Sequence, residues 1–416
     1  MRSRAQPVSR RWFIGAGAAI ACAGPAPCAQ AQTASDGLRL LHARTLGSGP
    51  SSGLSGLGYD GVVPGPTLRV RRGEELRVRL VNELPAATSV HWHGIRLPNA
   101  MDGVPPLTQP AVAPGASFDY RFRPPDAGTF WYHAHTADQA DRGLAGPLIV
   151  EEAQPVDVDR DIALVLTSAA DAPPVLVNGS VRPDLAVQGG ERVRLRIINA
   201  THTRGLFLTF AGHAVRVMAI DGQPAEPFLA RDSRVVLGPG NRIDLFVDMA
   251  EAGAATPVLA SLLTGARAEQ TIARLVSAGG GAARTGRRAD PLPLPPNPLP
   301  AHIDLRNSLK AELHLANARP LDPAGPALFT VKRGRAVTLA IRNTSGEPHG
   351  LHLHGHSARL LDRLDDGWKP FWMDTLVVGD QIERIAFVAD NPGKWLIACA
   401  PLERQDAGTA VWFAVN

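Results

Sequence analysis

Alternating apolar and polar positions recur three times along the chain, more than 100 residues apart each time. Residues 68–82, 185–199 and 329–343 each place a glycine at a turn, continue with a run of alternating apolar residues, and end on an asparagine nine positions after the glycine. Alternation with a period of two is typical of half-buried β-strands. A repeat of this length predicts repeated domains rather than a solenoid.

The recurrence predicts an all-β protein built from three Greek-key β-sandwich domains. The 36 prolines and 41 glycines agree with short strands joined by turns, and long apolar stripes of helical period are scarce. A Gly-, Arg- and Pro-rich stretch before the third repeat predicts a linker with polyproline character. The expected segments are a signal peptide over 1–31, domains over 32–155 and 156–278, the linker over 279–302, and a third domain over 303–416.

Histidines stand at matching positions of the first and third repeats. Nine residues after the terminal asparagine, both repeats begin a His-x-His-Gly motif, formed by His91 and His93 in the first and by His352 and His354 in the third. The second repeat has apolar residues there, so we expect the middle domain to act as a spacer at this position. Histidines clustered at short spacing are typical of copper and zinc sites. The alternative is a set of hydrogen-bonded interface histidines that holds no metal.

The densest histidine stretch runs from His349 to His356 and contains four imidazoles. Successive side chains of a strand point to opposite faces, so a strand here would place His352, His354 and His356 on one face and His349 on the other. Two ligand sets placed back to back predict two adjacent metal centres.

The second half of the unit also repeats. In the first domain a glycine is followed five and seven residues later by His133 and His135. The same frame in the third domain has Ala398 and Ala400, on either side of Cys399. This second motif therefore supplies a pair of candidate ligands in the first domain, whereas the two matching positions of the third domain supply none.

The N-terminus has the pattern of a twin-arginine export signal. Arg10 and Arg11 precede a short apolar run through Ala23, and Ala29–Ala31 is typical of a cleavage site. The apolar run is shorter than the about 20 residues that a membrane span needs. We expect cleavage after Ala31, no membrane span, and a mature protein that is periplasmic or secreted.

Removing the signal changes the charge and the cysteine count. Its four arginines face no acidic residue and account for the whole net charge of +4, so residues 32–416 are charge-balanced and predict no nucleic-acid partner. Two of the three cysteines leave with the signal, so the mature chain keeps Cys399 alone and forms no internal disulfide. That thiol is either buried and inert or, if it lies near Arg404, has a lowered pKa.

In their order and context, the motifs His-x-His-Gly, Trp-Tyr-His-x-His and His-x-x-His-x-His-Gly-His resemble those of the three-domain multicopper oxidases, the laccase family, over residues 36–416. The resemblance implies cupredoxin-like domains and copper as the cofactor. It implies that Asp102 is the catalytic carboxylate that assists proton delivery near the type 2 copper. It assigns type 2 ligands to His91 and His352, type 3 ligands to His93, His133, His135 and His354, and type 1 ligands to His349 and Cys399.

The chain departs from the family pattern in its last motif. The family has His-Cys-His-x-x-x-His, whereas this chain has alanine on both sides of Cys399, Arg404 in place of the last histidine, and Thr409 at the axial position. A type 1 site needs two imidazoles and a thiolate, and a guanidinium cannot ligate copper. We therefore expect fewer than four copper ions and impaired oxidase chemistry.

These observations leave three functions open. The first is a copper-dependent oxidoreductase that oxidises a small-molecule or metal-ion donor by single electrons and passes them to O₂. The second is a non-catalytic periplasmic scaffold with a protein partner, as in the copper-free cell-division relatives of the family. The third is a copper-binding or storage protein.

Overall fold

The computed structural model describes most of the chain after the expected signal peptide. The described residues are 37–47, 56–135, 139–169, 172–201, 203–249, 253, 255–263, 268–278, 288–316, 318–361, 368–402 and 408–416. They form six sheets and two short 3₁₀ turns, η1 (Asn99–Met101) and η3 (Arg231–Ser233). No helix among these residues is long and apolar enough to span a membrane. The expected signal peptide, 1–31, lies outside the described residues.

The first sandwich packs two four-stranded sheets and carries the first histidine motif on β5. In spatial order, one sheet is β2 (Leu57–Tyr59), β1 (Arg39–Thr45), β4 (Leu76–Asn82) and β6 (Ser117–Phe122). The other sheet is β3 (Leu68–Arg71), β8 (Ala145–Glu151), β7 (Gly128–His133) and β5 (His91–His93).

The middle sandwich is larger, with a six-stranded and a five-stranded sheet. The first is β10 (Ala172–Val177), β9 (Arg160–Ala169), β12 (Arg192–Asn199), β17 (Arg242–Asp248), β14 (Val215–Ile220) and β15 (Gln223–Leu229). The second is β11 (Asp184–Gln188), β19 (Gln270–Ala278), β18 (Ala255–Leu262), β13 (Leu206–Phe210) and β16 (Arg234–Leu237).

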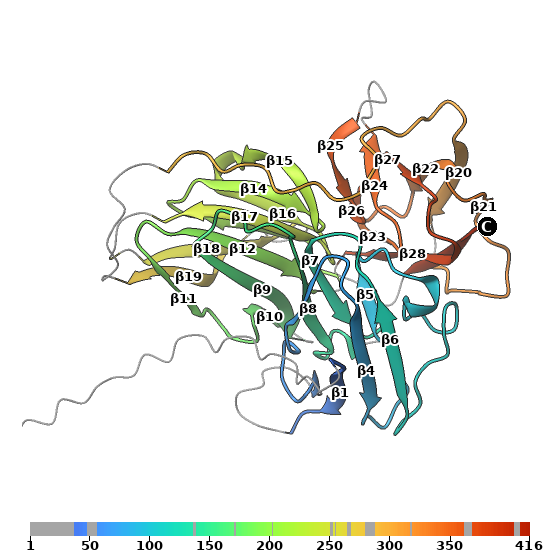
Figure 1. The fold of residues 1–416 in the computed structure, drawn as a ribbon, viewed down its shortest axis with the longest axis horizontal. Coiled ribbons are helices and arrows are strands. Elements are labelled where there is room, and N and C mark those ends of the chain that lie inside the picture. The colour runs from blue at the N-terminus through green and yellow to red at the C-terminus, as the bar shows by residue number, and fades with distance from the viewer. Residues whose placement is uncertain are drawn as a thin grey trace, which may run out of the picture.

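The third sandwich packs two five-stranded sheets and carries the second histidine motif on β23. One sheet is β20 (Leu309–Leu315), β22 (Ala336–Asn343), β27 (Ile382–Val388), β24 (Ala358–Leu361) and β25 (Trp368–Met373). The other is β21 (Thr330–Val331), β29 (Thr409–Val415), β28 (Gly393–Pro401), β23 (His349–Leu353) and β26 (Thr375–Val378). Figure 1 shows the first sandwich (blue to teal) at the bottom, the middle one (green to yellow) at upper left, and the third (orange to red) at upper right.

The predicted repeat is confirmed in the pairing of the strands. The repeat strands β4, β12 and β22 each run parallel to the strand that opens their own sandwich, β1, β9 and β20. Each repeat strand ends on its asparagine, Asn82, Asn199 or Asn343, whose Nδ2 donates to backbone carbonyls of the loop that follows and of the facing loop. The asparagine that ends each repeat therefore fixes the start of the next loop by satisfying carbonyls that a short loop leaves buried.

The buried apolar residues form two main cores. One is continuous through the first and third sandwiches and includes Trp92 and Trp395, whereas the middle sandwich has a core of its own. Leu208 and Phe210, the counterparts of the histidine motif in the middle repeat, are buried in that second core. The continuous core holds the two histidine-bearing strands in one rigid body, because packed interiors resist shifts of neighbouring elements.

The part of the expected linker that the structure describes, residues 288–302, contains no strand or helix but is fastened to the first two sandwiches. The buried Asn297 side chain accepts the Ala127 N–H and donates from Nδ2 to the Ala127 carbonyl oxygen, 2.8 Å in both cases. Its Nδ2 also donates to Gln223 Oε1 at 2.9 Å. One side chain thus joins three segments of the chain.

Replacing Asn297 with alanine is expected to destabilise the protein by about 1–3 kcal/mol, because buried donors and acceptors lose their partner. The comparison is Asn307→Ala, since Asn307 is exposed and its change is expected to stay within about 0.5 kcal/mol. Urea unfolding of the metal-free protein, followed by tryptophan fluorescence, measures both. Equal urea midpoints for the two variants would contradict the stabilising role of the Asn297 side chain.

Candidate metal centre

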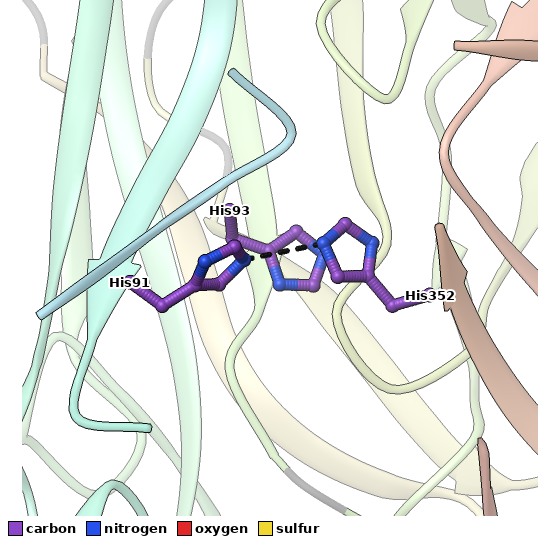
Figure 2. A group of neighbouring side chains, drawn as sticks. All are labelled: His91, His93 and His352. Carbon is purple, nitrogen blue, oxygen red and sulfur yellow. Dashed lines mark hydrogen bonds between the residues drawn. The ribbon is translucent and has the colours of Figure 1, made fainter. Parts of the chain in front are cut away.

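Strands β5 and β23 bring the two His-x-His motifs together at the interface of the first and third sandwiches. His91 Nε2 lies 3.2 Å from His352 Nε2, and the His93 and His352 rings stack with their centroids 3.6 Å apart. Figure 2 shows the rings of His91 and His352 pointing toward each other, with His93 between them at the rear. Residues 261 positions apart in sequence therefore share one site.

The other three predicted interface histidines join the same cluster. His133, at the end of β7, has its Nε2 3.4 Å from His93 Nδ1. His354 packs against His91 with ring centroids 4.1 Å apart, and His135 lies 5.4 Å from His354 by the same measure. We call these six side chains the histidine cluster: His91, His93, His133, His135, His352 and His354.

Five rings of the cluster have one nitrogen bound to an oxygen atom at its outer edge. The backbone oxygens of Asp102, Ala134 and Asp374 accept from Nδ1 of His91, His133 and His352 at 2.8, 2.9 and 3.1 Å. His93 Nε2 lies 2.9 Å from the Thr375 hydroxyl, and His354 Nδ1 lies 3.1 Å from Asp102 Oδ2. Carbonyl and carboxylate oxygens only accept, so these contacts place the ring hydrogen on the outer nitrogen.

The inner nitrogens are left as bare acceptors that face one another. His91 Nε2 and His352 Nε2 both carry a lone pair, because both rings bear their hydrogen on Nδ1. Two lone pairs at 3.2 Å repel each other unless a cation or a proton lies beside them. Metal-ligating histidines characteristically donate their second ring nitrogen to a carbonyl or a carboxylate. The donor set and its hydrogen bonds therefore fit a metal ion bound by imidazole.

Burial keeps the cluster imidazoles neutral. Desolvation, followed by the neighbouring imidazoles, lowers the pKa of His93 and His135 well below the usual value, and burial lowers the pKa of His91, His352 and His354 as well. Neutral imidazole is the form that binds metals. The cluster therefore presents ligands in their binding form at neutral pH.

Asp102 is fully buried beside two histidines of the cluster. Its burial alone would raise its pKa, but His354 and His91 lower the pKa of the carboxyl below its usual range. Oδ1 lies 3.3 Å from His91 Nδ1 and has no hydrogen-bond partner among the described residues. Asp102 therefore orients two rings and keeps one free acceptor oxygen inside the site.

The expected alternation of the third-domain histidines is wrong for His356. Strand β23 ends at Leu353, and Gly355 turns the chain with a positive φ of 65°, so strand parity does not extend to His356. Its ring packs among Phe387, Trp395 and Phe413, and burial lowers its pKa to about 4. His356 is thus a core residue of the third sandwich and not part of the cluster.

The region around Cys399 does not resemble the histidine cluster. Cys399 lies opposite Leu351 on β23 and opposite Thr409 on β29, and burial raises the pKa of its thiol. His349 is on the same face of β23 as Leu351, and its Nδ1 donates to the Glu347 carbonyl oxygen at 2.9 Å. This environment supports the inert-thiol interpretation over a thiol of lowered pKa.

The residues at Cys399 do not fit a type 1 copper. Among the described residues, each group of three ligand atoms within 4.8 Å of one another belongs to the cluster or to Asp102, and none contains His349 or Cys399. The chain has no histidine after His356 that could supply the second imidazole. Arg404, at the position of the family's last histidine, lies outside the described residues.

A cavity of about 590 Å³ joins the cluster to the Cys399 region. Ala398 lies opposite His352 on the neighbouring strand, and Ala400 lies opposite Gly350, so both small side chains leave this space open. The exposed residues Arg319 and Pro320 line the same cavity. A cavity of this size is typical of sites for small molecules.

The middle sandwich contributes to the site in a way that the sequence analysis missed. Arg242, at the start of β17, is fully buried and forms a two-bond ion pair with Asp374, at 2.6 and 2.7 Å. Burial would raise the pKa of Asp374, but the Arg242 guanidinium lowers it below the usual range. The available sequence signal was the pair of charged residues Arg242 and Asp244 at the start of a strand that continues with apolar residues. At the position of the histidine motif itself the middle sandwich carries the apolar Leu208 and Phe210, as expected, but it reaches the site elsewhere, through Arg242.

Comparisons with known proteins agree with this geometry. Three family models, each described as multicopper oxidase, match residues 49–155, 129–276 and 294–416. The chain is 29% identical to multicopper oxidase MmcO of Mycobacterium tuberculosis, over 97% of this chain and 95% of that protein. A copper resistance protein A homolog of Pseudomonas syringae is 42% identical over 120 residues, which cover 28% of this chain and 20% of that protein.

Two solved structures extend the likeness to three dimensions. The multi-copper oxidase from Pseudomonas thermotolerans superposes with a TM-score of 0.82 at 32% identity, covering 93% of this chain and all of that one. Lac15 from a marine microbial metagenome superposes with a TM-score of 0.76 at 33% identity, covering 91% of this chain and 99% of that one. The expected all-β, cupredoxin-like fold is confirmed. By its sequence, its three-sandwich fold and its histidine cluster, the chain belongs to the multicopper oxidase family of copper-binding oxidoreductases.

Proposed function

We propose that this protein is exported through the twin-arginine route and binds copper at the histidine cluster, with fewer than four ions per chain. The observation that carries the proposal is the pair of bare nitrogens, His91 Nε2 and His352 Nε2, held 3.2 Å apart by hydrogen bonds on the far side of each ring. A metal-free interface would gain nothing from placing two buried lone pairs against each other. Copper satisfies both, and imidazole is one of its preferred ligands.

The proposed assignment of ligands follows the resemblance to the multicopper oxidase family. His91 and His352 would hold one ion, and His93, His133, His135 and His354 would hold the remaining copper. His93 would bind through Nδ1, since its Nε2 is bound to Thr375. His349 and Cys399 remain near each other without a complete donor set, so we assign them no ion.

The proposed chemistry is one-electron oxidation of a small-molecule or metal-ion donor coupled to reduction of O₂, in impaired form. Bound copper would supply the one-electron redox chemistry and an open position for O₂. The chain would supply six imidazoles, at least five of them with a lowered pKa, and a buried carboxylate oxygen, Asp102 Oδ1, 3.3 Å from His91 Nδ1. A donor would reach the cluster through the cavity beside Ala398 and Ala400. The impairment follows because the Cys399 region lacks the second imidazole that an electron-accepting copper would need.

A copper-binding protein without oxidase turnover is the second candidate. The unsuitable donor set at Cys399 favours it, since electrons from a donor would have no separate site of entry. Both candidates place copper on the same six histidines and differ only in turnover. A periplasmic protein partner would be needed only for the metal-free scaffold alternative.

The mature chain, residues 32–416, is expected to retain one or two copper ions after loading with Cu(II) and desalting. The EPR spectrum should show a type 2 signal, and the visible spectrum should lack the intense band of a blue copper–thiolate site. Copper analysis, EPR and absorption on one sample test all three. A strong blue band would show that a type 1 site forms despite the missing imidazole.

Replacing both His91 and His352 with alanine should abolish the type 2 signal, because these rings face each other across the proposed site. The matched control is His302→Ala, since His302 is exposed and lies outside the cluster. It should bind copper like the unmodified chain. If the unmodified chain keeps no copper, or the double variant keeps all of it, the proposed site is wrong.

The metal-free protein is expected to lose stability as the pH falls below about 6.5, the pKa of histidine in an unfolded chain. Burial lowers the pKa of at least five cluster imidazoles in the folded state, so the unfolded state binds more protons in this range and unfolding becomes easier toward low pH. Urea midpoints of the metal-free protein at pH 7.5 and pH 5.0 give the comparison. Equal midpoints would show that the rings titrate normally in the folded protein.

A further inference from the structure

Arg242 uses all of its hydrogen-bond donors at the junction of the three sandwiches. Its Nε donates to the Thr129 carbonyl of the first sandwich at 3.3 Å. Nη1 donates to Asp374 Oδ1 of the third at 2.7 Å and to the Gly240 carbonyl at 3.4 Å, while Nη2 donates to Asp374 Oδ2 at 2.6 Å and to the Asp221 carbonyl at 2.8 Å. A guanidinium has five N–H groups in a fixed plane, and here each has an acceptor. The position of Asp374 is therefore specified by a residue of the middle sandwich.

Asp374 in turn orients the Thr375 hydroxyl, which contacts two histidines of the cluster. The Thr375 hydroxyl has one hydrogen, which it donates to Asp374 Oδ1 at 2.8 Å. Its oxygen is then only an acceptor toward His93 Nε2 at 2.9 Å and toward His352 Nδ1 at 3.2 Å. His93 must carry its hydrogen on Nε2, which leaves Nδ1 free to face His133. The side chain of Asp374 thus decides which nitrogen of His93 is available to a metal.

The backbone of the same segment is held by the middle sandwich as well. Asp221 Oδ2 accepts the N–H groups of Asp374 and Thr375 at 3.2 and 3.0 Å. Asn241 Nδ2 donates to the Thr375 carbonyl at 2.9 Å. Three side chains of the middle sandwich, those of Asp221, Asn241 and Arg242, therefore act on the two residues that orient His93 and His352.

Two glycines show how closely these groups are packed. A Cβ on Gly94, directly after the first histidine motif, would lie 2.1 Å from Arg242 Nη2 and 2.7 Å from Asp374 Oδ2. A Cβ on Gly240 would lie 2.8 Å from the His93 ring. Both glycines have a positive φ, which other residues rarely adopt. The close approach leaves the guanidinium and the ring little freedom to shift.

We propose that Arg242 is a positioning residue of the metal centre, and that the middle sandwich sets the orientation and the tautomer of His93 and His352 through Arg242, Asp374 and Thr375. This inference rests on the proposed copper site. It gives the middle sandwich, which contributes no imidazole to the cluster, a specific role in metal binding. Outer-sphere partners of this kind commonly change metal affinity by about 10–100-fold when removed.

The test compares Cu(II) affinity and EPR hyperfine splitting in Arg242→Met, Arg242→Lys and a matched control. The control is Arg194→Met, because Arg194 is as deeply buried in the same sheet and pairs with Asp244 and Glu152, which contact no histidine of the cluster. Arg242→Met is expected to weaken copper binding about 10–100-fold and to change the hyperfine splitting. Arg242→Lys should not restore either, since an ammonium cannot form the planar two-bond pair. Arg194→Met should keep the affinity and the spectrum of the unmodified chain.

A further variant covers the case in which Arg242→Met does not fold. Thr375→Val keeps the shape of the side chain but removes the oxygen that accepts from His93, and we expect about a tenfold loss of affinity with an altered spectrum. An unchanged affinity and spectrum in Arg242→Met or in Thr375→Val would overturn the inference while leaving the copper site intact. Equal losses in Arg242→Met and Arg194→Met, or full recovery in Arg242→Lys, would also overturn it. An unmodified chain that binds no copper at all would overturn the proposed function and this inference together.

Discussion

Six imidazoles meet at one interface, five of them buried, and the cost of removing their ring nitrogens from water determines much of what surrounds them. The outer nitrogens of five of the rings are satisfied by oxygen atoms that the protein places there, three of them backbone carbonyls. The inner nitrogens are left facing one another. This division explains why Asp102, Asp374 and Thr375 are buried beside the rings, and why the family's copper is the natural complement to the arrangement.

The two regions that would bind metal in a multicopper oxidase differ in this chain in how complete their sets of candidate ligands are. The interface cluster holds all six predicted histidines in one place, and surrounding oxygens fix the tautomers of five of them. The Cys399 region has a thiol that burial keeps protonated, and it lacks a second imidazole. The two alanines beside Cys399 leave a cavity that reaches the cluster directly. The chain therefore combines a cluster of six histidines with a Cys399 region whose described residues form no comparable group of ligands, and both proposed functions rest on this difference.

The middle sandwich helps to hold the side chains of the metal centre in position. Its apolar Leu208 and Phe210 replace the histidine pair of the other repeats and serve its own core. Yet Arg242 reaches the junction of the three sandwiches, where its five donors bind groups from each of them. A domain that supplies no ligand to the cluster can thus still determine the geometry of ligands that other domains provide.

The sequence alone determined the repeat, the sandwich class and the six cluster histidines, because strand alternation and motif spacing are local and the three copies align with one another. It also revealed the departure in the last motif, where Ala398, Ala400 and Arg404 stand at the positions of the family's histidines. The tertiary structure decided what local patterns do not contain. His356 lies outside the cluster because the chain turns at Gly355 and strand alternation does not continue. The side chains of Asn297 and Arg242 form hydrogen bonds that connect segments far apart in sequence. Those roles depend on which buried carbonyls and carboxylates come within hydrogen-bond distance, and only the packing of the three sandwiches sets those distances.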